Sequence, residues 1–377
     1  MKIFLVANTD WYLYRFRLSL ANHLRDHGHQ VVFVSPAGNY VSQLESQGFP
    51  WRRWEVGRQS VNPFKEAGAI IGLLRIIKHE APDLIHLHTI KPVLYGSFCT
   101  WFQKRILLVQ SITGRGYVFL GEDLQAKLLR PLIKTIFRIA LNSDRGTVIF
   151  ENETDRNYFI LQRLVRPERT NVVQGVGVDT DYYSFTQEPA GVPIVVLAGR
   201  MLWDKGVGTF VDAARILHNK FPVRFVLVGE PDSGNPASIP IEILEAWVKE
   251  GVVEWWGWQS DMRQVFSMCH IVTLPSLGEG LPTILLEAAS SGRPIVATDV
   301  PGCRDVVGNE INGLIVPAQQ PAALAAALER LILDAGTRLS MGKAGRDLVV
   351  HKFSTSIVNS STLNVYQDLV GELPGES

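Results

Sequence analysis

The stretch VLAGRMLWDKGVG, residues 196–208, carries the pattern that decides the fold. An apolar strand ends at Ala198, a glycine follows, and a helix is expected to begin near Val207. A strand that leads through a short loop into a helix is the repeating unit of a parallel α/β sheet. Arg200 and Lys205 lie in the loop, where a guanidinium, an ammonium and the free N–H groups of a helix suit a diphosphate. The alternative is that both charges are simply solvated.

The same alternation of apolar strand and helix extends outward in both directions. Predicted strands cover Lys2–Val6, Val31–Ser35, Leu84–His88, Ile106–Ile112, Thr147–Phe150, Val172–Val178, Ile194–Ala198, Arg224–Val228, Val252–Trp256, Ile271–Pro275, Ile295–Thr298 and Leu314–Val316. Predicted helices include Arg15–His27, Val207–Lys220 and Pro321–Leu333. Short runs that are apolar almost throughout suit strands covered on both faces. The sequence therefore predicts an α/β protein with two facing, doubly wound Rossmann-like domains and a deep cleft between them.

The domain boundary is expected between Asp179 and Pro193, a stretch rich in turn-forming residues. We predict an N-terminal domain over residues 1–185 and a C-terminal domain over residues 186–355. A last helix over residues 356–377 is expected to pack back on the N-terminal domain.

Composition excludes several classes of protein. Of the 377 residues, 46% are hydrophobic and 20% are charged, as in a water-soluble globular chain. No apolar run approaches the ~20 residues of a membrane span, and residues 1–10 lack the apolar core of a signal peptide. The three cysteines lie too far apart for a disulfide framework or a structural zinc site, which favours the cytoplasm.

The net charge is zero, but residues 1–185 contain 23 Lys and Arg against 16 Asp and Glu, so the first half is expected to face an anionic partner.

A second informative run is LPSLGEGLPTILLEA, residues 274–288. Gly278 and Gly280 bracket Glu279, which allows the backbone to approach a ligand closely. Pro282 is expected in the first turn of a helix that begins at Leu281, with its free N–H groups directed towards the loop. Glu287 follows eight residues after Glu279, so the two carboxylates are expected to face one ligand from its two ends. The alternative is a glycine-rich turn followed by an exposed helical glutamate.

Together, Arg200, Lys205, Glu279 and Glu287 resemble the signature of the retaining glycosyltransferases of family 4, whose fold is called GT-B. The segment EGLPTILLE matches that family's Glu-x7-Glu pair. The segments NVVQGVGVDTDYYSF, FVLVGE, VVEWWGW and SSGRPIVATDVPGCRDVV are similar to the family as well. The resemblance spans nearly the whole chain and implies a nucleotide-activated sugar held mainly by the second domain.

The resemblance also implies roles for individual residues. Arg200 and Lys205 would bind the diphosphate, Glu279 would touch the donor sugar, and these three would be the catalytic residues. Glu287 would bind the ribose hydroxyls, and Val253 with its neighbours would form the edge that reads the nucleobase. The remaining donor contacts would come from Gly278, Gly280, Leu281, Pro282 and Thr283.

The chemistry that the resemblance implies is attack on the same face of the sugar as the leaving phosphate, which takes the proton of the acceptor. Such a reaction needs no protein nucleophile, and none with a catalytic setting is visible in the sequence. No cofactor and no metal are expected, since no His, Asp or Glu cluster has metal spacing. Asp179-Thr180-Asp181 spells the DxD motif of a different glycosyltransferase fold, and we interpret it as structural.

One departure from the family lies in VQSITGRGYVF, residues 109–119. Many relatives have a histidine where this chain has Thr113, and threonine cannot carry a charge near neutral pH. Thr113 and Gly114 are predicted donor contacts. This loop resembles that of bacterial enzymes that add N-acetylhexosamines, notably N-acetylgalactosamine, to polyprenyl-diphosphate-linked sugars.

The acceptor is expected at the first domain. Tyr14, Arg15 and Arg17 follow the first strand in NTDWYLYRFR and are candidates to contact donor phosphates or an acceptor diphosphate. Alternatively, the tyrosine lines the core and the two arginines lie at the surface. Arg58 and His88 are further acceptor candidates, although a lone histidine at a strand end is more often structural.

A basic stripe is visible in LQAKLLRPLIKTIFRIAL, residues 124–141. Lys127, Arg130, Lys134 and Arg138 are spaced by three, four and four, which aligns them along one helix. Such a helix suits an anionic membrane surface, or it is a domain helix with a solvated face.

These observations predict a cytoplasmic, retaining glycosyltransferase associated with the inner face of the cell membrane. It would move N-acetylgalactosamine or N-acetylglucosamine from a UDP-sugar to a lipid-diphosphate-linked saccharide in surface-glycan assembly. No nucleic acid partner is expected. The alternatives are an enzyme like UDP-N-acetylglucosamine 2-epimerase and a non-catalytic subunit that binds nucleotide sugars.

Overall fold

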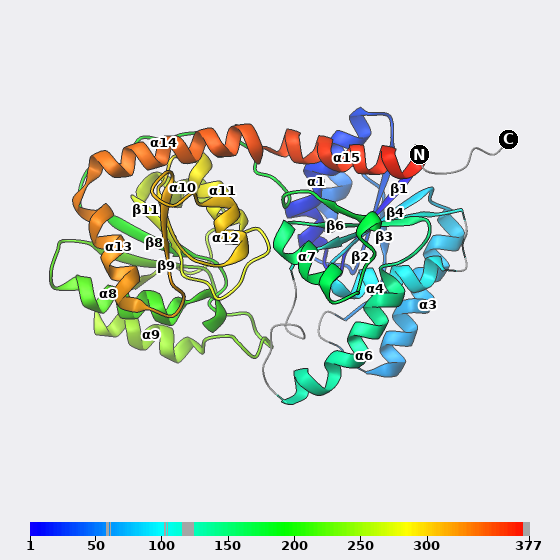
Figure 1. The fold of residues 1–377 in the computed structure, drawn as a ribbon, viewed down its shortest axis with the longest axis horizontal. Coiled ribbons are helices and arrows are strands. Elements are labelled where there is room, and N and C mark those ends of the chain that lie inside the picture. The colour runs from blue at the N-terminus through cyan, green and yellow to red at the C-terminus, as the bar shows by residue number, and fades with distance from the viewer. Residues whose placement is uncertain (58–59, 61, 102, 104, 115–123, 372–377) are drawn as a thin grey trace. The chain divides into compact units, whose positions relative to one another are not determined.

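The computed structural model describes residues 1–57, 60, 62–101, 103, 105–114 and 124–371. The chain divides into two compact units, one of Met1–Val176 with Thr355–Ser377 and one of Gly177–Ser354. Figure 1 shows the fold of the chain and labels many of the elements of both units. The division falls at Gly177, ahead of the expected boundary at residues 185 and 186, and the last helix belongs to the first unit.

The first unit contains a seven-stranded sheet in the order β3-β2-β1-β4-β5-β6-β7, with every pair parallel. Its strands are β1 (Lys2–Val6), β2 (Gln30–Ser35), β3 (Trp51–Arg53), β4 (Leu84–His88), β5 (Leu107–Ile112), β6 (Gly146–Phe150) and β7 (Thr170–Val172). Its helices are α1 (Asp10–Asp26), α2 (Val41–Ser46), α3 (Pro63–Glu80), α4 (Ile90–Thr100), α6 (Leu124–Ala140), α7 (Glu153–Leu161) and α15 (Thr355–Gly371), with a 3₁₀ turn η1 at Pro167–Arg169. Helices α1 and α15 contribute to the hydrophobic core on one face of the sheet, and α3, α4, α6 and α7 contribute to the core on the other.

The sequence prediction omitted one strand of this sheet and misplaced another. Strand β3 was not predicted, because two of its three residues are arginines and it forms no apolar run. The predicted strand over residues 172–178 ends at Val172, because Gly175 and Gly177 adopt φ of 70° and 71° and turn the chain.

The second unit contains a six-stranded parallel sheet in the order β10-β9-β8-β11-β12-β13. Its strands are β8 (Ile194–Ala198), β9 (Arg224–Val228), β10 (Glu254–Trp255), β11 (Ile271–Leu274), β12 (Ile295–Thr298) and β13 (Gly313–Val316). Its helices are α8 (Val207–His218), α9 (Ile241–Glu250), α10 (Met262–Met268), α11 (Thr283–Ser290), α12 (Pro301–Val306), α13 (Pro321–Leu333) and α14 (Ala335–Lys352), with a 3₁₀ turn η2 at Trp203–Lys205.

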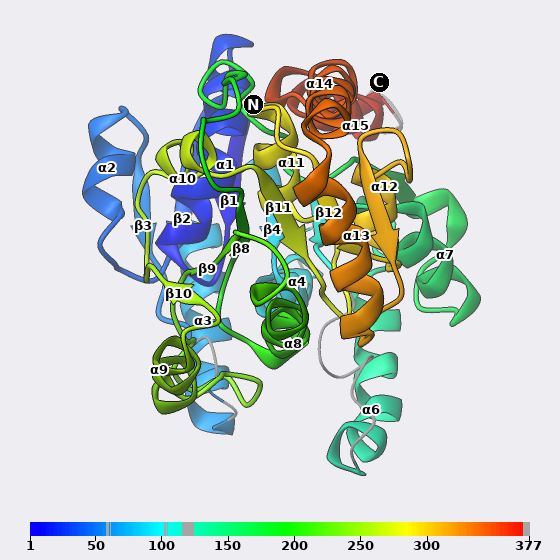
Figure 2. The same cartoon turned by 90° about the vertical axis from the view of Figure 1, so that its left-hand side faces the viewer.

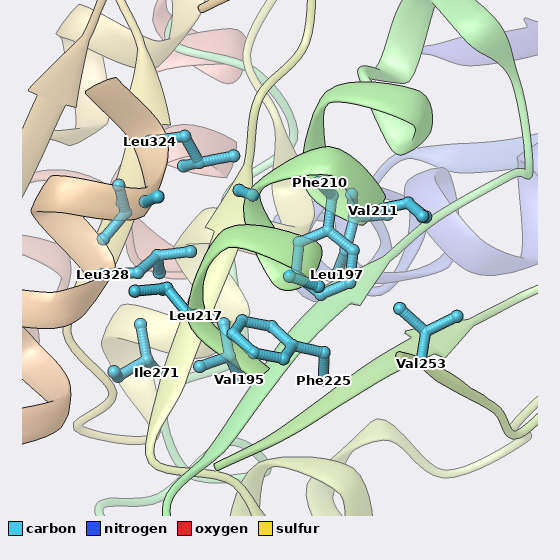
Figure 3. Close-up of a cluster of buried hydrophobic side chains, with 14 of the residues drawn as sticks. Val195, Leu197, Phe210, Val211, Leu217, Phe225, Val253, Ile271, Leu324 and Leu328 are labelled. Carbon is cyan, nitrogen blue, oxygen red and sulfur yellow. The ribbon is translucent and has the colours of Figure 1, made fainter. Parts of the chain in front are cut away.

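Burial on both faces explains why the central strands of the second unit are apolar throughout. Val195 and Leu197 of β8 pack with α8 and α13, as Figure 3 shows for Phe210 and Leu328. The alternate residues of β8 pack instead with α11 and α14 (Figure 2). Successive side chains of a strand point to opposite faces, so a strand between two helical layers needs no polar position.

The strand order identifies the edge of each sheet where a ligand is expected to bind. The order reverses between β1 and β4 in the first sheet and between β8 and β11 in the second. Loops that leave the carboxyl ends of strands at such a switch point diverge to opposite faces and leave room for a ligand. The two loops that the sequence singles out in the second unit follow β8 and β11.

Candidate active site

The loop after β8 is shaped by close backbone packing. Gly206 has φ 73°, which favours glycine, and a Cβ atom there would lie 1.9 Å from the carbonyl oxygen of Pro275. The backbone N–H of Leu277 donates to Asp204 O over 2.8 Å, and Ser276 Oγ donates to the same oxygen over 3.1 Å. These contacts tie the loops after β8 and β11 to one another.

The loop after β11 is held from its other side by α12. A Cβ atom on Gly302 would lie 2.1 Å from Gly280 O, so the start of α12 lies directly against this loop. Thr298 Oγ1 at the end of β12 donates to Ser276 O over 2.5 Å. The positions of Glu279 and its flanking glycines are therefore set by three neighbouring strands of the sheet.

Two ion pairs occupy this edge of the second sheet. Lys205 Nζ lies 2.6 and 2.8 Å from the two carboxylate oxygens of Glu279, and their side chains are only 21% and 9% exposed. Arg200 Nη1 lies 2.6 Å from Asp232 Oδ2, with the arginine half exposed. The edge thus holds two cations, each oriented by a carboxylate, and both cations have further donor N–H groups for an incoming anion.

Asp232 was not predicted from the sequence. It follows β9, the strand next to β8, and so reaches the same edge as Arg200. The available signal was its place shortly after the apolar run that ends at Val228.

Cys303 of α12 is buried near the Lys205–Glu279 pair. Burial raises the pKa of its thiol, the charge of Glu279 raises it further, and Lys205 opposes both only in part. A thiol kept protonated in this way is a poor nucleophile.

Helix α11 differs slightly from its prediction. It begins at Thr283, with Pro282 at the N-cap in an extended conformation, whereas the sequence predicted a start at Leu281. Leu281 lies in a bend before the helix, and its side chain belongs to the hydrophobic core. The helical conformation is disfavoured for a residue that precedes proline, which explains the later start. Glu287 lies on the second turn of α11 and is buried.

Val253, the residue named for the predicted nucleobase edge, has a buried side chain. Val253 is 4% exposed and packs in the core cluster drawn in Figure 3, ahead of β10. Its side chain is committed to packing, so a ligand contact at this position can come only from the backbone. Gly257 O accepts from the N–H of Gly229, which joins this edge to the end of β9.

The first unit contains a buried polar network at the equivalent edge of its sheet. The ring nitrogens of His86 on β4 lie 2.5 Å from Tyr366 Oη and 2.7 Å from Ser111 Oγ. The His86 and His88 rings are in contact, with centroids 3.9 Å apart and planes tilted by 46°. Burial lowers the pKa of both histidines well below the ordinary value, so both rings are neutral.

Arg17 brings a positive charge to this network. It is 5% exposed, and its Nη2 donates to Tyr12 Oη over 2.9 Å. In the described part of the chain, Arg17 Nε, both ring nitrogens of His88 and Thr89 Oγ1 are buried without a hydrogen-bond partner, and Arg17 forms no ion pair with a carboxylate. A buried cation without a counter-ion is costly, which favours an anionic ligand here. Tyr12 was not predicted as a site residue.

Four other predicted site residues of the first unit are among those that the structure describes. Tyr14 packs against Tyr40, with ring centroids 5.2 Å apart, and Arg15 is exposed on α1. Thr113 and Gly114 follow β5 and are half-buried. Arg58 lies outside the described residues.

The DxD letters have a local role. Asp179 Oδ1 accepts the backbone N–H groups of Asp181 and Tyr182 and closes a turn. Across the ranges that the structure describes, no group of three or more His, Cys, Asp or Glu side chains is placed to hold a metal ion. None of the described helices is both long enough and apolar enough to span a bilayer.

Two parallel α/β units with paired cations at the switch point define the fold class, which is that of the GT-B glycosyltransferases. The structure is similar to HepE of Anabaena in complex with UDP-glucose, with a TM-score of 0.79 and 20% sequence identity over 98% of this chain and 100% of that one. It is also similar to WaaG, a glycosyltransferase involved in lipopolysaccharide biosynthesis, with a TM-score of 0.72 and 14% identity over 96% and 99% of the two chains.

Sequence comparison identifies the family of the chain. Residues 192–334 match the model of glycosyl transferases group 1, and residues 2–152 match the glycosyl transferase 4-like model. The chain therefore belongs to the glycosyltransferase family, and its activity is that of a hexosyltransferase.

Relatives that cover most of the chain include two whose names specify a diphosphate-linked acceptor. It is 26% identical over 384 residues to the N,N'-diacetylbacillosaminyl-diphospho-undecaprenol alpha-1,3-N-acetylgalactosaminyltransferase of Campylobacter jejuni, covering 98% of this chain and 99% of the relative. It is 23% identical over 326 residues to the UDP-Gal:alpha-D-GlcNAc-diphosphoundecaprenol alpha-1,3-galactosyltransferase of Escherichia coli, covering 83% and 82%.

Proposed function

We propose that this glycosyltransferase moves an N-acetylhexosamine from a UDP-sugar to a lipid-diphosphate-linked saccharide, with retention of the anomeric configuration and without a metal ion. The observation that carries the proposal is the pair of cations, Arg200 and Lys205, held by carboxylates at the switch point of the second sheet. The donor is assigned to the second unit and the acceptor to the first.

On the donor side, each charged residue predicted for the site in the second unit has a task in binding the nucleotide sugar or stabilising the leaving group. Departure of UDP builds negative charge on the β-phosphate, and fixed cations stabilise that charge without reorganisation. Arg200 and Lys205 would supply the cations, Glu279 would orient Lys205 and touch the sugar, and Glu287 would bind the ribose. Support comes from HepE, which was solved with UDP-glucose, and from the E. coli relative, whose name specifies UDP-Gal.

No protein nucleophile has a role in this proposal. The acceptor hydroxyl would attack on the face that the phosphate leaves, and a phosphate oxygen would take its proton. The protonated and buried thiol of Cys303 fits this scheme, because it leaves no reactive thiolate beside the donor.

On the acceptor side, the uncompensated charge of Arg17 is the main support. The unpartnered nitrogens of Arg17 and His88 are donors and acceptors suited to a diphosphate or to sugar hydroxyls. Tyr14 and Arg15 on the same helix would extend this site. The names of both relatives specify acceptors linked through diphosphate to undecaprenol.

The choice of sugar rests on the loop after β5. Thr113 offers a hydrogen bond but no charge, which suits a neutral N-acetyl or hydroxyl group. The Campylobacter relative transfers N-acetylgalactosamine by name, so N-acetylgalactosamine is the first donor to test and N-acetylglucosamine the second.

We also propose that the enzyme lies on the inner face of the cell membrane, where a lipid-linked acceptor would be found. Arg138 and the exposed apolar residues Leu132, Ile136 and Ile139 occur on the same helix, α6. Basic and apolar groups on one exposed helix suit an anionic bilayer surface.

The test is nucleotide release from a panel of UDP- and GDP-sugars, each with and without a polyprenyl-diphosphate-N-acetylhexosamine acceptor. We expect acceptor-dependent release of UDP from one donor, with loss of that release in Arg200→Ala and Glu279→Ala. Binding of UDP-sugars without turnover would instead support a non-catalytic subunit. Conversion of UDP-N-acetylglucosamine to its 2-epimer without transfer would support an epimerase.

A further inference from the structure

A hollow of about 530 Å³ lies in the first unit between α6, the end of α7 and η1. Three arginines line it, namely Arg138, Arg163 and Arg166, together with the apolar side chains of Ile160 and Val165. This hollow has no role in the donor and acceptor sites described above.

The frame of the hollow is built by side-chain to backbone bonds. Asn142 Nδ2 donates to Arg138 O and Leu164 O over 2.7 and 2.9 Å. Asn142 Oδ1 accepts the N–H of Arg166 over 2.8 Å, and Arg138 Nε donates to Arg163 O over 2.9 Å. The backbone of this frame and the Arg138 side chain are thus held by hydrogen bonds, and the side chains of the three arginines are exposed around it.

Arg163 itself adopts a conformation that favours glycine. Its φ is 54°, a left-handed value that is unfavourable for a residue other than glycine. Its N–H donates to Ile160 O over 2.8 Å, which holds the turn. The chain therefore carries a strained arginine at the rim of the hollow.

The charge around the hollow is poorly compensated. Arg166 pairs with Asp144 at 3.0 Å, but that aspartate is 87% exposed and lies outside the lining. Among the residues described, Arg138 and Arg163 form no ion pair with a carboxylate. Guanidinium groups gathered in this way repel each other, and an anion among them would relieve that repulsion.

The apolar surroundings narrow the class of anion. Val165 is buried in the floor, and Ile160 is half-buried. Next to it Leu161 is 80% exposed, and α6 exposes Leu132, Ile136 and Ile139 at spacings of four and three. Basic groups above an apolar floor suit an amphiphile whose phosphate is joined to acyl chains.

We propose that this hollow binds the phosphate of one anionic phospholipid of the bilayer, with Arg138 and Arg163 as its ligands. It deepens the proposed membrane contact by assigning it a discrete site. The lipid would hold the first unit at the membrane, where the lipid-linked acceptor lies.

The test compares three proteins by co-sedimentation with vesicles: the parent chain, the double variant Arg138→Gln/Arg163→Gln, and the control Lys220→Gln/Lys249→Gln. The control removes two exposed charges from the other unit. With phosphatidylcholine vesicles that contain phosphatidylglycerol, we expect the double variant to bind about thirty-fold more weakly than the parent. The control is expected to change binding by much less. Equal weakening in both variants, or none in the double variant, would overturn the site.

A second measurement separates lipid from free phosphate. Monomeric short-chain phosphatidylglycerol is expected to bind the parent chain and not the double variant, whereas inorganic phosphate at the same concentration should not compete. Competition by inorganic phosphate as effective as that of the lipid would contradict a phospholipid site. Sugar transfer to a detergent-dissolved acceptor is expected to be unchanged in the double variant, so loss of vesicle binding alone leaves the proposed enzyme function intact. Parallel thermal melts exclude unfolding as the cause.

Discussion

The pair formed by Lys205 and Glu279 allows a catalytic role to be separated from a structural one. In Lys205→Met the stem of the side chain remains but its charge is lost. Glu279, which is 9% exposed, would then keep a carboxylate with no ammonium within hydrogen-bond distance of its two oxygens. The matched variants are Glu279→Gln and the double change Lys205→Met/Glu279→Gln.

The burial of the two side chains sets the expected loss of stability. A fully exposed pair contributes ~0–1 kcal/mol and a fully buried one costs ~3–5 kcal/mol when one partner is removed. The Lys205 side chain is 21% exposed, so Lys205→Met is expected to cost ~1–3 kcal/mol of stability, mainly from the carboxylate left unpaired. The second change, to glutamine, removes that unpaired charge and is expected to restore most of the lost stability.

Turnover should respond differently. Loss of one group that stabilises developing charge lowers kcat by ~10²–10³, and neutralising Glu279 supplies no cation to replace it. The assay is UDP release at saturating donor and acceptor, alongside denaturation midpoints for all four proteins. Recovery of kcat together with stability in the double variant would show that Lys205 acts only through folding, and the diphosphate assignment would be wrong.

Three further predictions concern single positions. Arg17→Met should raise the KM for a lipid-diphosphate acceptor by about tenfold or more while leaving the KM for the donor unchanged; an equal change in both would contradict acceptor binding. Burial holds the pKa of His88 below its ordinary value of 6.5, so the unfolded chain binds more protons in acid. The stability contribution is complete above that pH, and the denaturation midpoint should fall as the pH drops below it, less steeply in His88→Asn; identical slopes would refute this cause. Gly206→Ala and Gly251→Ala both place alanine at positive φ, but only the first meets a carbonyl, that of Pro275. Thermal melts should show that Gly251→Ala lowers the free energy of unfolding by ~1 kcal/mol and that Gly206→Ala lowers it by much more. Equal losses would contradict the prediction, because they would show that the loop after β8 shifts to make room for the added methyl group.

Much of the fold could be predicted because buried parallel strands have a distinctive composition. Strands β1, β4, β8, β9 and β12 have the bounds expected from their apolar runs. Helix α1 begins earlier than the expected Arg15, because Thr9 caps it by accepting the N–H of Tyr12 over 3.2 Å. Short polar strands such as β3 gain their pairing from a neighbour, and no local pattern marks them.

The sequence by itself determined the two series of strand–loop–helix units and the loops that carry Arg200, Lys205 and Glu279, since these depend on residues close together in the chain. Only the tertiary structure decided which side chains contact one another at the two sites. The pairing of Lys205 with Glu279 joins loops 74 residues apart, and the contact between His86 and Tyr366 joins residues 280 apart. Such contacts form where α15 docks on the first sheet and where two loops meet at a switch point. Strand order and helix docking decide both, because a hydrogen bond depends on distances of a few tenths of an ångström that spacing along a chain does not encode.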